Sequence, residues 1–321
     1  MTAATLPPPQ DASYNHQCAQ INGIRMHFID VGPRDAIPLV LVHGFPDLWY
    51  GWKHQIASLR TKYRVIAADS RGFGETDAPV DAELYRRKTV ADDFAKLLDH
   101  LEIKQAVFIG HDWGGDLVWR MCNFHPDRVL AVASVCTPYF PTMPTKVTLH
   151  ERVAAFPEFE YQLTFAAPET TALYDANMAN FLHMMYSHGT LEDLAGLAKS
   201  IPNQSLQGPH PELFTADEFQ YYVDQYSRQG FQGPLNWYRT AEYDWEDLAH
   251  KPLAGISHEA LFIAASQDLV LRPSLSEHME KFIPRLTRRL VEGGTHWVLH
   301  DKPDQVNAIL HEWLATVTST P

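Results

Sequence analysis

The sequence predicts an α/β protein in which a mostly parallel sheet carries helices on both faces and a helical cap is inserted before the last strands. Three observations lead to this prediction: an opening hairpin signal, a regular alternation of strand and helix patterns, and a long stretch where the alternation stops. Strands that alternate with helices favour a parallel sheet covered on both faces, because each crossover helix returns across one face.

The hairpin signal is Asn22-Gly23, which separates two strand-like runs. A two-residue Asn-Gly loop favours a hairpin because both positions of the turn take positive φ. We therefore expect two antiparallel strands at the start of the chain. The residues before them, with prolines at positions 7, 8 and 9, are expected to form a loose arm.

The alternation follows the hairpin. Continuous apolar runs predict buried strands, and apolar residues at helical spacing predict helices. The predicted strands are Leu39–Gly44, Arg64–Ser70, Ala106–Gly110 and Val129–Val135, and the predicted helices are Gly51–Lys62, Thr89–Leu101 and Asp116–Phe124.

The alternation stops near Thr137. Residues 138–249 are rich in aromatic residues, Met, Pro and Gln, and contain no continuous apolar run. Helical patterns there cover Thr170–Met185, Thr190–Ser200 and Thr215–Gln229. We interpret residues 138–249 as a helical cap over the carboxyl ends of the strands, where open α/β sheets bind ligands. The core would then consist of residues 1–137 and 250–321.

Strand patterns return after the cap. They cover Ala260–Asp268 and Arg288–Gly294, and helical patterns cover Leu275–Phe282 and Pro303–Val317. These segments predict that the sheet continues beyond the insertion and ends with a helix.

Composition excludes several classes of protein. The chain has 39 acidic and 26 basic residues and a formal net charge of −13, which argues against nucleic-acid binding. Its apolar runs are shorter than the roughly 18 residues that a membrane span needs, and the first residues lack the features of a secretory signal. Three scattered cysteines, Cys18, Cys122 and Cys136, predict neither a disulfide framework nor a zinc site. We expect a soluble, cytoplasmic protein, and the oligomeric state is left open.

The segment Gly110-His111-Asp112-Trp113-Gly114 lies between a predicted strand and a predicted helix. A sharp strand-to-helix turn needs small residues on both sides of its central residue, whose side chain it raises above the sheet edge. Esterases carry Ser at this position, whereas this chain carries Asp112. The positive end of the following helix would stabilise its carboxylate. The alternative is an aspartate that only caps the helix.

Two residues late in the chain fit the partners of such a nucleophile. Asp268 follows one predicted strand and His296 follows the next, so the order is nucleophile, acid, histidine. His111 and His300 compete with His296 for the role of base. We expect His111 to point away beneath the loop, and His300 comes one helical turn after His296.

The segment His43-Gly44-Phe45-Pro46 follows a predicted strand, where this arrangement places half of an oxyanion hole. We expect the backbone N–H of Phe45 and the N–H of the residue after Asp112, Trp113, to form that hole. Pro46 is a candidate for a cis peptide bond, since such bonds favour tight functional turns. The alternative is a plain strand–helix loop.

Together, HGFPDLWYGW, DSRGFGETD, GHDWGG, GGTHW and the position of Asp268 resemble the α/β-hydrolase superfamily, and within it the soluble-type epoxide hydrolases. The resemblance spans about Ile21 to Leu314 and implies an α/β-hydrolase fold with a helical cap. The segments FEYQLTFAAPE and LNWYR resemble the family's two lid segments, which implies that Tyr161 and Tyr238 donate protons.

The chemistry implied by the resemblance explains the aspartate. A serine would form a stable ether with an epoxide carbon, whereas a carboxylate forms an ester that water can hydrolyse. Asp112 would attack the epoxide, the tyrosines would donate to the alkoxide, and water activated by His296 would cleave the ester, with Asp268 orienting the histidine. The reactants are an apolar epoxide and water, the product is a vicinal diol, and no metal or organic cofactor is required.

Two other functions remain open at this point. A haloalkane dehalogenase uses the same aspartate, but Phe45 stands where that family often has Asn or Glu, and a tyrosine pair suits an alkoxide better than a halide. A fluoroacetate dehalogenase would need arginines beside the elbow, and along the chain the nearest is Arg120. A non-catalytic receptor on this fold would not need the complete set of catalytic groups.

Overall fold

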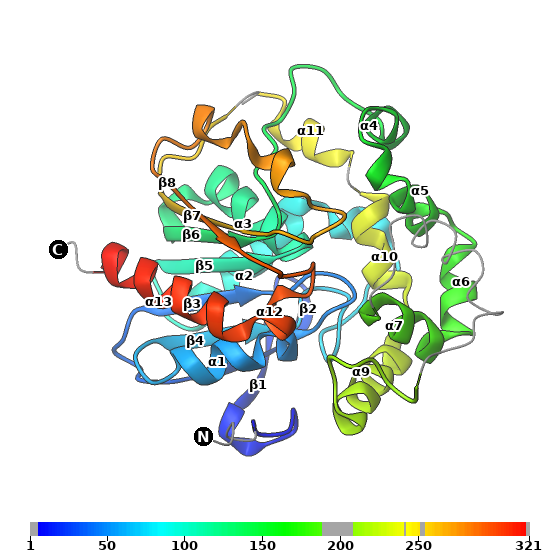
Figure 1. The fold of residues 1–321 in the computed structure, drawn as a ribbon, viewed down its shortest axis with the longest axis horizontal. Helices are drawn as coiled ribbons and strands as arrows, with labels where there is room; N and C mark the ends of the chain where they lie inside the picture. Colours follow the sequence, from blue (N-terminus) through cyan, green and yellow to red (C-terminus); the bar gives the residue numbers. More distant parts are fainter. Residues whose placement is uncertain (1–5, 188–207, 241, 251–253, 319–321) are drawn as a thin grey trace.

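The computed structural model describes residues 6–187, 208–240, 242–250 and 254–318. Strands of this part of the chain form one sheet in the order β1-β2-β4-β3-β5-β6-β7-β8 (Figure 1). The strands are β1 (His16–Ile21), β2 (Ile24–Val31), β3 (Pro38–Val42), β4 (Arg64–Ala68), β5 (Ala106–His111), β6 (Val129–Val135), β7 (Glu259–Ala265) and β8 (Leu286–Val291).

The predicted fold class is confirmed. The pairs β1–β2 and β2–β4 are antiparallel, and all other neighbouring strands are parallel. The opening hairpin is also confirmed, because Ile21 pairs with Ile24 across the Asn-Gly turn. Parallel strands between two helical layers are apolar along their length, and every residue of β3 after Pro38 is buried.

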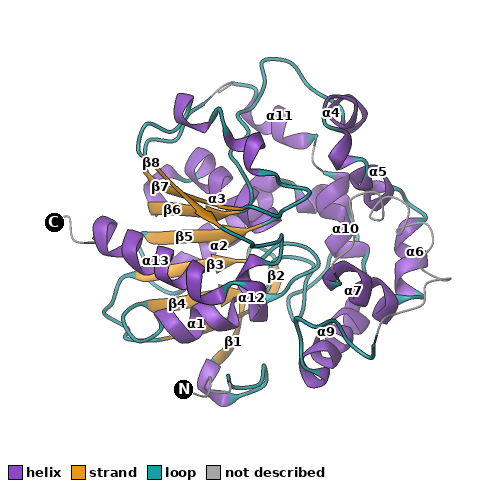
Figure 2. Ribbon diagram, in the orientation of Figure 1, coloured by secondary structure: helices purple, strands orange, loops and turns teal. Residues whose placement is uncertain are grey.

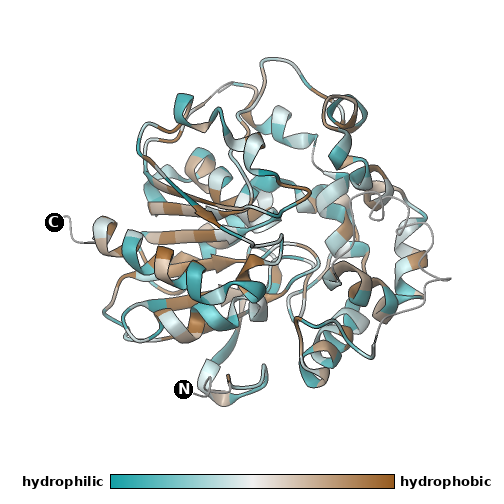
Figure 3. Ribbon diagram, viewed as in Figure 1, coloured by the Kyte–Doolittle hydropathy of each residue, from teal (hydrophilic) through white to brown (hydrophobic). Residues whose placement is uncertain are grey.

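Helices cover both faces of the sheet (Figures 1 and 2). On one face α1 packs against α13, and on the other face α2 packs against α3. The flanking helices are α1 (Lys53–Leu59), α2 (Arg87–His100), α3 (Trp113–Phe124), α12 (Val298–Asp301) and α13 (Pro303–Thr318). Hydropathy follows this layering, with the apolar residues concentrated along the strands (Figure 3).

The described chain between β6 and β7 forms helices and no strand (Figure 2). These helices are α4 (Leu149–Ala155), α5 (Tyr161–Ala166), α6 (Thr170–Asp175), α7 (Met178–Tyr186), α9 (Ala216–Gln229), α10 (Gln232–Arg239) and α11 (Tyr243–Leu248). Most of them lie beyond the carboxyl ends of the strands, on the right of Figure 1, and α11 lies at the top. The helical pattern at Thr190–Ser200 lies outside the described residues.

Local sequence explains where two of these helices begin. Thr148 caps α4 and Thr215 caps α9, and each is followed three residues later by a glutamate. In both cases the threonine side chain accepts the glutamate N–H, and the glutamate carboxylate accepts the threonine N–H. This reciprocal capping satisfies backbone donors that the first turn of a helix leaves free.

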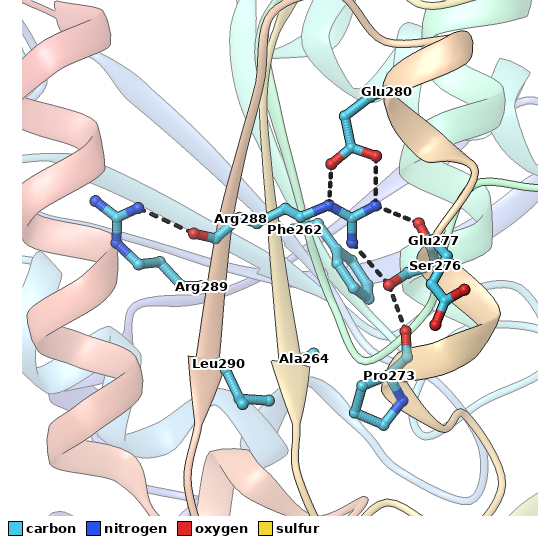
Figure 4. A pocket seen from close by; sticks show the side chains of 9 residues that line it. All are labelled: Phe262, Ala264, Pro273, Ser276, Glu277, Glu280, Arg288, Arg289 and Leu290. Atoms are coloured by element: carbon cyan, nitrogen blue, oxygen red, sulfur yellow. Dashed lines mark hydrogen bonds and ion pairs between the residues drawn. The ribbon is translucent and has the colours of Figure 1, made fainter.

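The predicted helix Leu275–Phe282 is wrong. The segment forms two short 3-10 turns, Pro273–Ser276 and Met279–Lys281. An α-helix would need the Ser276 carbonyl to accept the N–H of Glu280, but that carbonyl accepts a hydrogen bond from the Arg288 guanidinium instead. Figure 4 shows Arg288 held between Glu280 and Ser276 in a groove of about 470 Å³ beside β8.

Two of the predictions from composition concern membrane spans and cysteines, and the described residues bear on both. No helix in the described ranges has the length and apolar character needed to cross a membrane. Cys18, Cys122 and Cys136 are all free thiols.

Candidate active site

Asp112 stands at the sharp turn between β5 and α3. Its φ is +54°, a conformation that residues other than glycine rarely adopt. The turn also requires glycines around it. A Cβ on Gly110 would lie 2.1 Å from the carbonyl oxygen of Gly114, and a Cβ on Gly114 would lie 2.0 Å from that of Val42. The close packing of strand and helix therefore explains the small residues that flank Asp112.

The carboxylate of Asp112 faces the loop after β3. Its Oδ1 accepts a hydrogen bond from the backbone N–H of Phe45 at 2.8 Å, and the Phe45–Pro46 peptide is cis. Burial raises the pKa of Asp112, and the charge of His296 and the N–H groups of Phe45 and Trp113 oppose this effect. Oδ1 of Asp112 therefore lies at the backbone N–H of Phe45, one of the two N–H groups that the sequence predicts to form an oxyanion hole.

His296 connects Asp112 with Asp268. Its Nδ1 lies 2.8 Å from Oδ2 of Asp268, and its Nε2 lies 3.6 Å from Oδ2 of Asp112. Oδ1 of Asp268 accepts the backbone N–H groups of Val270 and Leu271, at 2.9 and 2.8 Å. Burial lowers the pKa of His296, but attraction to Asp268 and Asp112 outweighs it and raises the pKa to about 9.

The two competing histidines have other contacts. Nε2 of His111 lies 2.8 Å from the carbonyl oxygen of His296, and burial lowers the pKa of His111 to about 3. Nε2 of His300 lies 3.9 Å from Oδ2 of Asp47. Among these three histidines, the structure brings only His296 within 4 Å of the Asp112 carboxylate.

Tyr161 in α5 and Tyr238 in α10 lie together above this group. Their ring centroids are 6.3 Å apart in an edge-to-face arrangement. The ring of Tyr238 also contacts those of Trp113 and Phe45, with centroid distances of 5.0 and 5.5 Å. Burial, and to a lesser extent the Asp112 charge, raise the pKa of both tyrosines, so both hydroxyls remain protonated at neutral pH.

A cavity of about 640 Å³ opens beside Asp112, Trp113 and Tyr161. Its volume is within the usual range for small-molecule sites. Apolar residues of the 138–249 segment line much of it, among them Phe140, Met143, Val147, Phe156 and Phe159. The Asp112 carboxylate therefore faces a chamber that can hold a mostly apolar molecule.

The cavity wall also contains charged residues to which the sequence analysis gave no role: Arg87, Asp116, Arg120, Glu151, Arg152, Glu242 and Asp244. Along the chain Arg120 is the arginine nearest to the elbow, but in space the Arg87 guanidinium lies 4.2 Å from the ring centroid of Trp113. No local pattern marks these residues, because they come from segments at four helices, α2, α3, α4 and α11, which meet only in the folded chain.

His111, Cys136 and His296 are the described residues that come nearest to a metal-binding group, with one ligand atom each within 4.8 Å of the others. His296 already uses Nδ1 for Asp268 and presents Nε2 to Asp112. Both ring nitrogens of His296 therefore face carboxylate oxygens.

Comparison with known proteins identifies the family. Residues 37–303 match the α/β hydrolase fold family, and residues 10–52 match the epoxide hydrolase N terminus. The chain is 32% identical to epoxide hydrolase A of Mycobacterium tuberculosis over 91% of its own length and 95% of the relative. This chain belongs to the epoxide hydrolases of the α/β-hydrolase fold.

Other epoxide hydrolases support this assignment. The chain is 40% identical to bifunctional epoxide hydrolase 2 of Sus scrofa over 93% of its length. It spans little more than half of this relative, 55%. The crystal structure of epoxide hydrolase A from Mycobacterium thermoresistibile matches with a TM-score of 0.82 and 33% identity, covering 94% of this chain and 98% of that one. A catalytic triad and a helical cap are typical of epoxide hydrolases.

Proposed function

We propose that this chain converts epoxides to vicinal diols through an ester on Asp112. One observation carries the proposal: the Phe45 N–H holds Oδ1 of Asp112 at 2.8 Å, while His296 stands 3.6 Å from Oδ2. This geometry leaves Oδ2 free to attack an epoxide carbon. Oδ1 then becomes the carbonyl oxygen of the ester, already placed at the backbone N–H groups that stabilise an oxyanion.

In the first step, Oδ2 of Asp112 forms a bond to an epoxide carbon and the C–O bond of the ring breaks. The leaving alkoxide takes a proton from Tyr161 or Tyr238. Both hydroxyls carry that proton at neutral pH, because burial raises the pKa of both groups. Tyr161 and Tyr238 thus serve as acids for the alkoxide oxygen of the opened epoxide. This oxygen develops negative charge outside the oxyanion hole.

In the second step, His296 takes a proton from water, and the hydroxide attacks the ester carbon. The bond between this carbon and Oδ2 then breaks. The diol leaves with Oδ2 and the proton of the attacking hydroxide, Asp112 returns as a carboxylate that contains the oxygen from water, and the proton on His296 returns through water to the tyrosine.

Ester formation removes the negative charge of Asp112, which is one of the groups that raise the pKa of His296. The pKa of His296 therefore falls once the ester has formed, so a larger fraction of the imidazole is neutral and available to take a proton from water. Asp268, held by two backbone N–H groups, stabilises the imidazolium that results.

We further propose that residues 138–249 act as a cap on a core made of residues 1–137 and 250–321. Support comes from the described helices between β6 and β7: α5 and α10 carry Tyr161 and Tyr238, and residues of α4, α5 and α11 line the cavity. We expect the reactants to be an apolar epoxide and water. Free thiols at all three cysteines fit a reducing compartment such as the cytoplasm, which we propose as the location.

A substrate panel tests the proposal. The purified chain is incubated with styrene oxide, stilbene oxide, a fatty-acid epoxide and a chloroalkane, and diol and halide are both measured. We expect diol from at least one epoxide, no halide, and no turnover by Asp112→Ala. Halide release without diol would identify a dehalogenase, and binding without turnover would identify a receptor. Either result would overturn the proposed function.

A further inference from the structure

One buried arginine joins the Asp112 elbow to α10. Arg87 is the first residue of α2, and it is 1% exposed. Its Nε lies 2.9 Å from Oδ2 of Asp116, which stands one helical turn after Asp112. Its Nη2 donates to the backbone carbonyl of Trp237 at 3.0 Å, and Trp237 directly precedes Tyr238 in α10. A single guanidinium thus holds both the helix that follows the nucleophile and the helix of one lid tyrosine.

The same guanidinium also contacts two indole rings. The Cζ of Arg87 lies 4.2 Å from the ring centroid of Trp113 and 5.2 Å from that of Trp237. A cation within about 6 Å of an aromatic centroid is attracted to the ring. The Trp113 ring in turn meets the Tyr238 ring edge to face, with centroids 5.0 Å apart. Arg87 therefore reaches Tyr238 by two routes, through the backbone of α10 and through the ring of Trp113.

A second link from α10 leads elsewhere. Nε1 of Trp237 donates to the backbone carbonyl of Arg71 at 3.1 Å. Arg71 belongs to the chain between β4 and α2, which carries none of the proposed reacting groups. Arg87 differs from this link because its side chain also binds α3. It is therefore placed to set the distance between Tyr238 and Asp112.

Stability alone does not explain this arginine. Burial of a guanidinium costs solvation, and a buried ion pair is often no more stabilising than apolar residues of the same volume. Nη1 of Arg87 is also buried and has no hydrogen-bond partner in the described part of the protein, which adds a further cost. α10, in contrast, needs contacts that fix its place, because it has eight residues and isolated helices of that length are marginal in water. The contribution of Arg87 is therefore one of geometry.

We propose that Arg87 is a positioning residue for the first step: it holds the Tyr238 hydroxyl where the alkoxide forms as Asp112 attacks the epoxide. Arg87 acts on the alkoxide only through Tyr238. This inference rests on the proposed function, because it deepens the role of Tyr238 in the same reaction. A displacement of about 1 Å can cost about a hundredfold in rate, so loss of Arg87 should slow the opening of the epoxide ring.

The test is a double-mutant cycle on the single-turnover alkylation by styrene oxide. Arg87→Met should slow alkylation about ten- to hundredfold, both alone and in a Tyr161→Phe background. In a Tyr238→Phe background it should add less than about threefold, since the hydroxyl that Arg87 positions is already absent. Hydrolysis of the ester, measured as decay of the adduct, should change by less than about threefold, because Tyr238 donates in the first step. A general loss of structure would slow both steps.

Arg86→Met is the matched control. Arg86 also joins the start of α2 to a later helix, because its Nη2 lies 2.7 Å from Oδ1 of Asp247 in α11. Alkylation in this variant should stay within about twofold of the wild type, as expected for a partly exposed ion pair. Arg87→Lys keeps the charge beside Trp113 but not the planar fork, so it should slow alkylation less than Arg87→Met. It also supplies the cycle if Arg87→Met does not fold.

Two results would overturn the inference and leave the proposed function intact. One is an equal loss from Arg87→Met with and without the Tyr238 hydroxyl, and the other is an equal loss in Arg87→Met and Arg86→Met. Normal alkylation by Tyr238→Phe alone would remove the proposed role of this tyrosine, and the inference with it. A wild-type protein that forms neither adduct nor diol would overturn the proposed function itself together with the inference.

Discussion

Nε2 of His296 lies 3.6 Å from Oδ2 of Asp112, just beyond hydrogen-bond distance, while Nδ1 of the same ring is held by Asp268 at 2.8 Å. The bond to Asp268 determines the orientation of the ring, and in the proposed mechanism the gap leaves Oδ2 of Asp112 available as the nucleophile. The negative charge of Asp112 nevertheless raises the pKa of His296. The protonation of the base therefore depends on whether Asp112 is a carboxylate or an ester.

This dependence can be measured with Asp112→Asn, which is uncharged like the ester. Removal of the negative charge favours the neutral imidazole, so the pKa of His296 should fall from about 9 toward its ordinary value of 6.5. NMR titration of the His296 ring in both proteins measures the change. The control is Asp127→Asn, an exposed site away from the cavity. A pKa that is the same in all three proteins would contradict the coupling.

The two-step mechanism predicts a covalent adduct. His296→Gln removes the base for the second step while Asp112 can still attack. After long exposure to a reactive epoxide, this variant should gain the mass of one substrate molecule on the peptide that contains Asp112. Intact-protein mass spectrometry followed by peptide mapping measures this. Little diol should form.

One control variant and two contrary outcomes complete this experiment. Asp112→Ala should show neither adduct nor diol. An unmodified His296→Gln protein, under conditions where the wild type turns over, would indicate direct attack of water on the epoxide. An adduct on His300 or His111 would show that a different residue is the nucleophile.

The lid tyrosines should share the donation to the alkoxide. Tyr161→Phe and Tyr238→Phe should each slow alkylation about ten- to hundredfold, because a hydrogen bond to a charged group contributes about 1.5 to 3 kcal/mol. The double variant should lose nearly all alkylation in single-turnover measurements. Tyr174→Phe is a matched control, since its buried hydroxyl has no hydrogen-bond partner among the described residues. Normal alkylation by the double variant would exclude both tyrosines as donors.

Gly44 should be essential for alkylation because its position has no room for a side chain. A Cβ at this position would lie 2.3 Å from Oδ1 of Asp112, so Gly44→Ala must displace the nucleophile. Because a shift of about 1 Å can cost about a hundredfold in rate, we expect at least that loss in alkylation. Gly23→Ala is the control. A Cβ at this position would have no atom within 4 Å, but the backbone φ is +82°. This substitution should lower the free energy of unfolding by about 1 kcal/mol and leave the alkylation rate unchanged. Equal alkylation rates in both variants would contradict this account.

Features set by short stretches of chain could be predicted from the sequence. The Asn-Gly turn produced the hairpin, and the glycines around Asp112 produced the elbow, because each depends on backbone conformations or close approaches that few residues allow. The alternation of strand and helix patterns predicted the sheet, since burial imposes a period on each element. The helix expected at Leu275–Phe282 failed because a distant side chain, Arg288, binds a carbonyl oxygen that the helix would have needed.

The tertiary structure decided the contacts between distant segments. Seventeen histidines are present in the sequence, and only folding shows that His296, rather than His111 or His300, reaches the Asp112 carboxylate. The charged residues of the cavity could not be predicted either, because they lie far apart in the sequence. Arg87 from α2 and Arg152 from α4 line the same cavity as Asp112. The sequence by itself determined the fold and the chemistry of the nucleophile, because these follow from local conformation and periodic burial. The surroundings of the substrate depended on long-range packing, which no short pattern in this chain encodes.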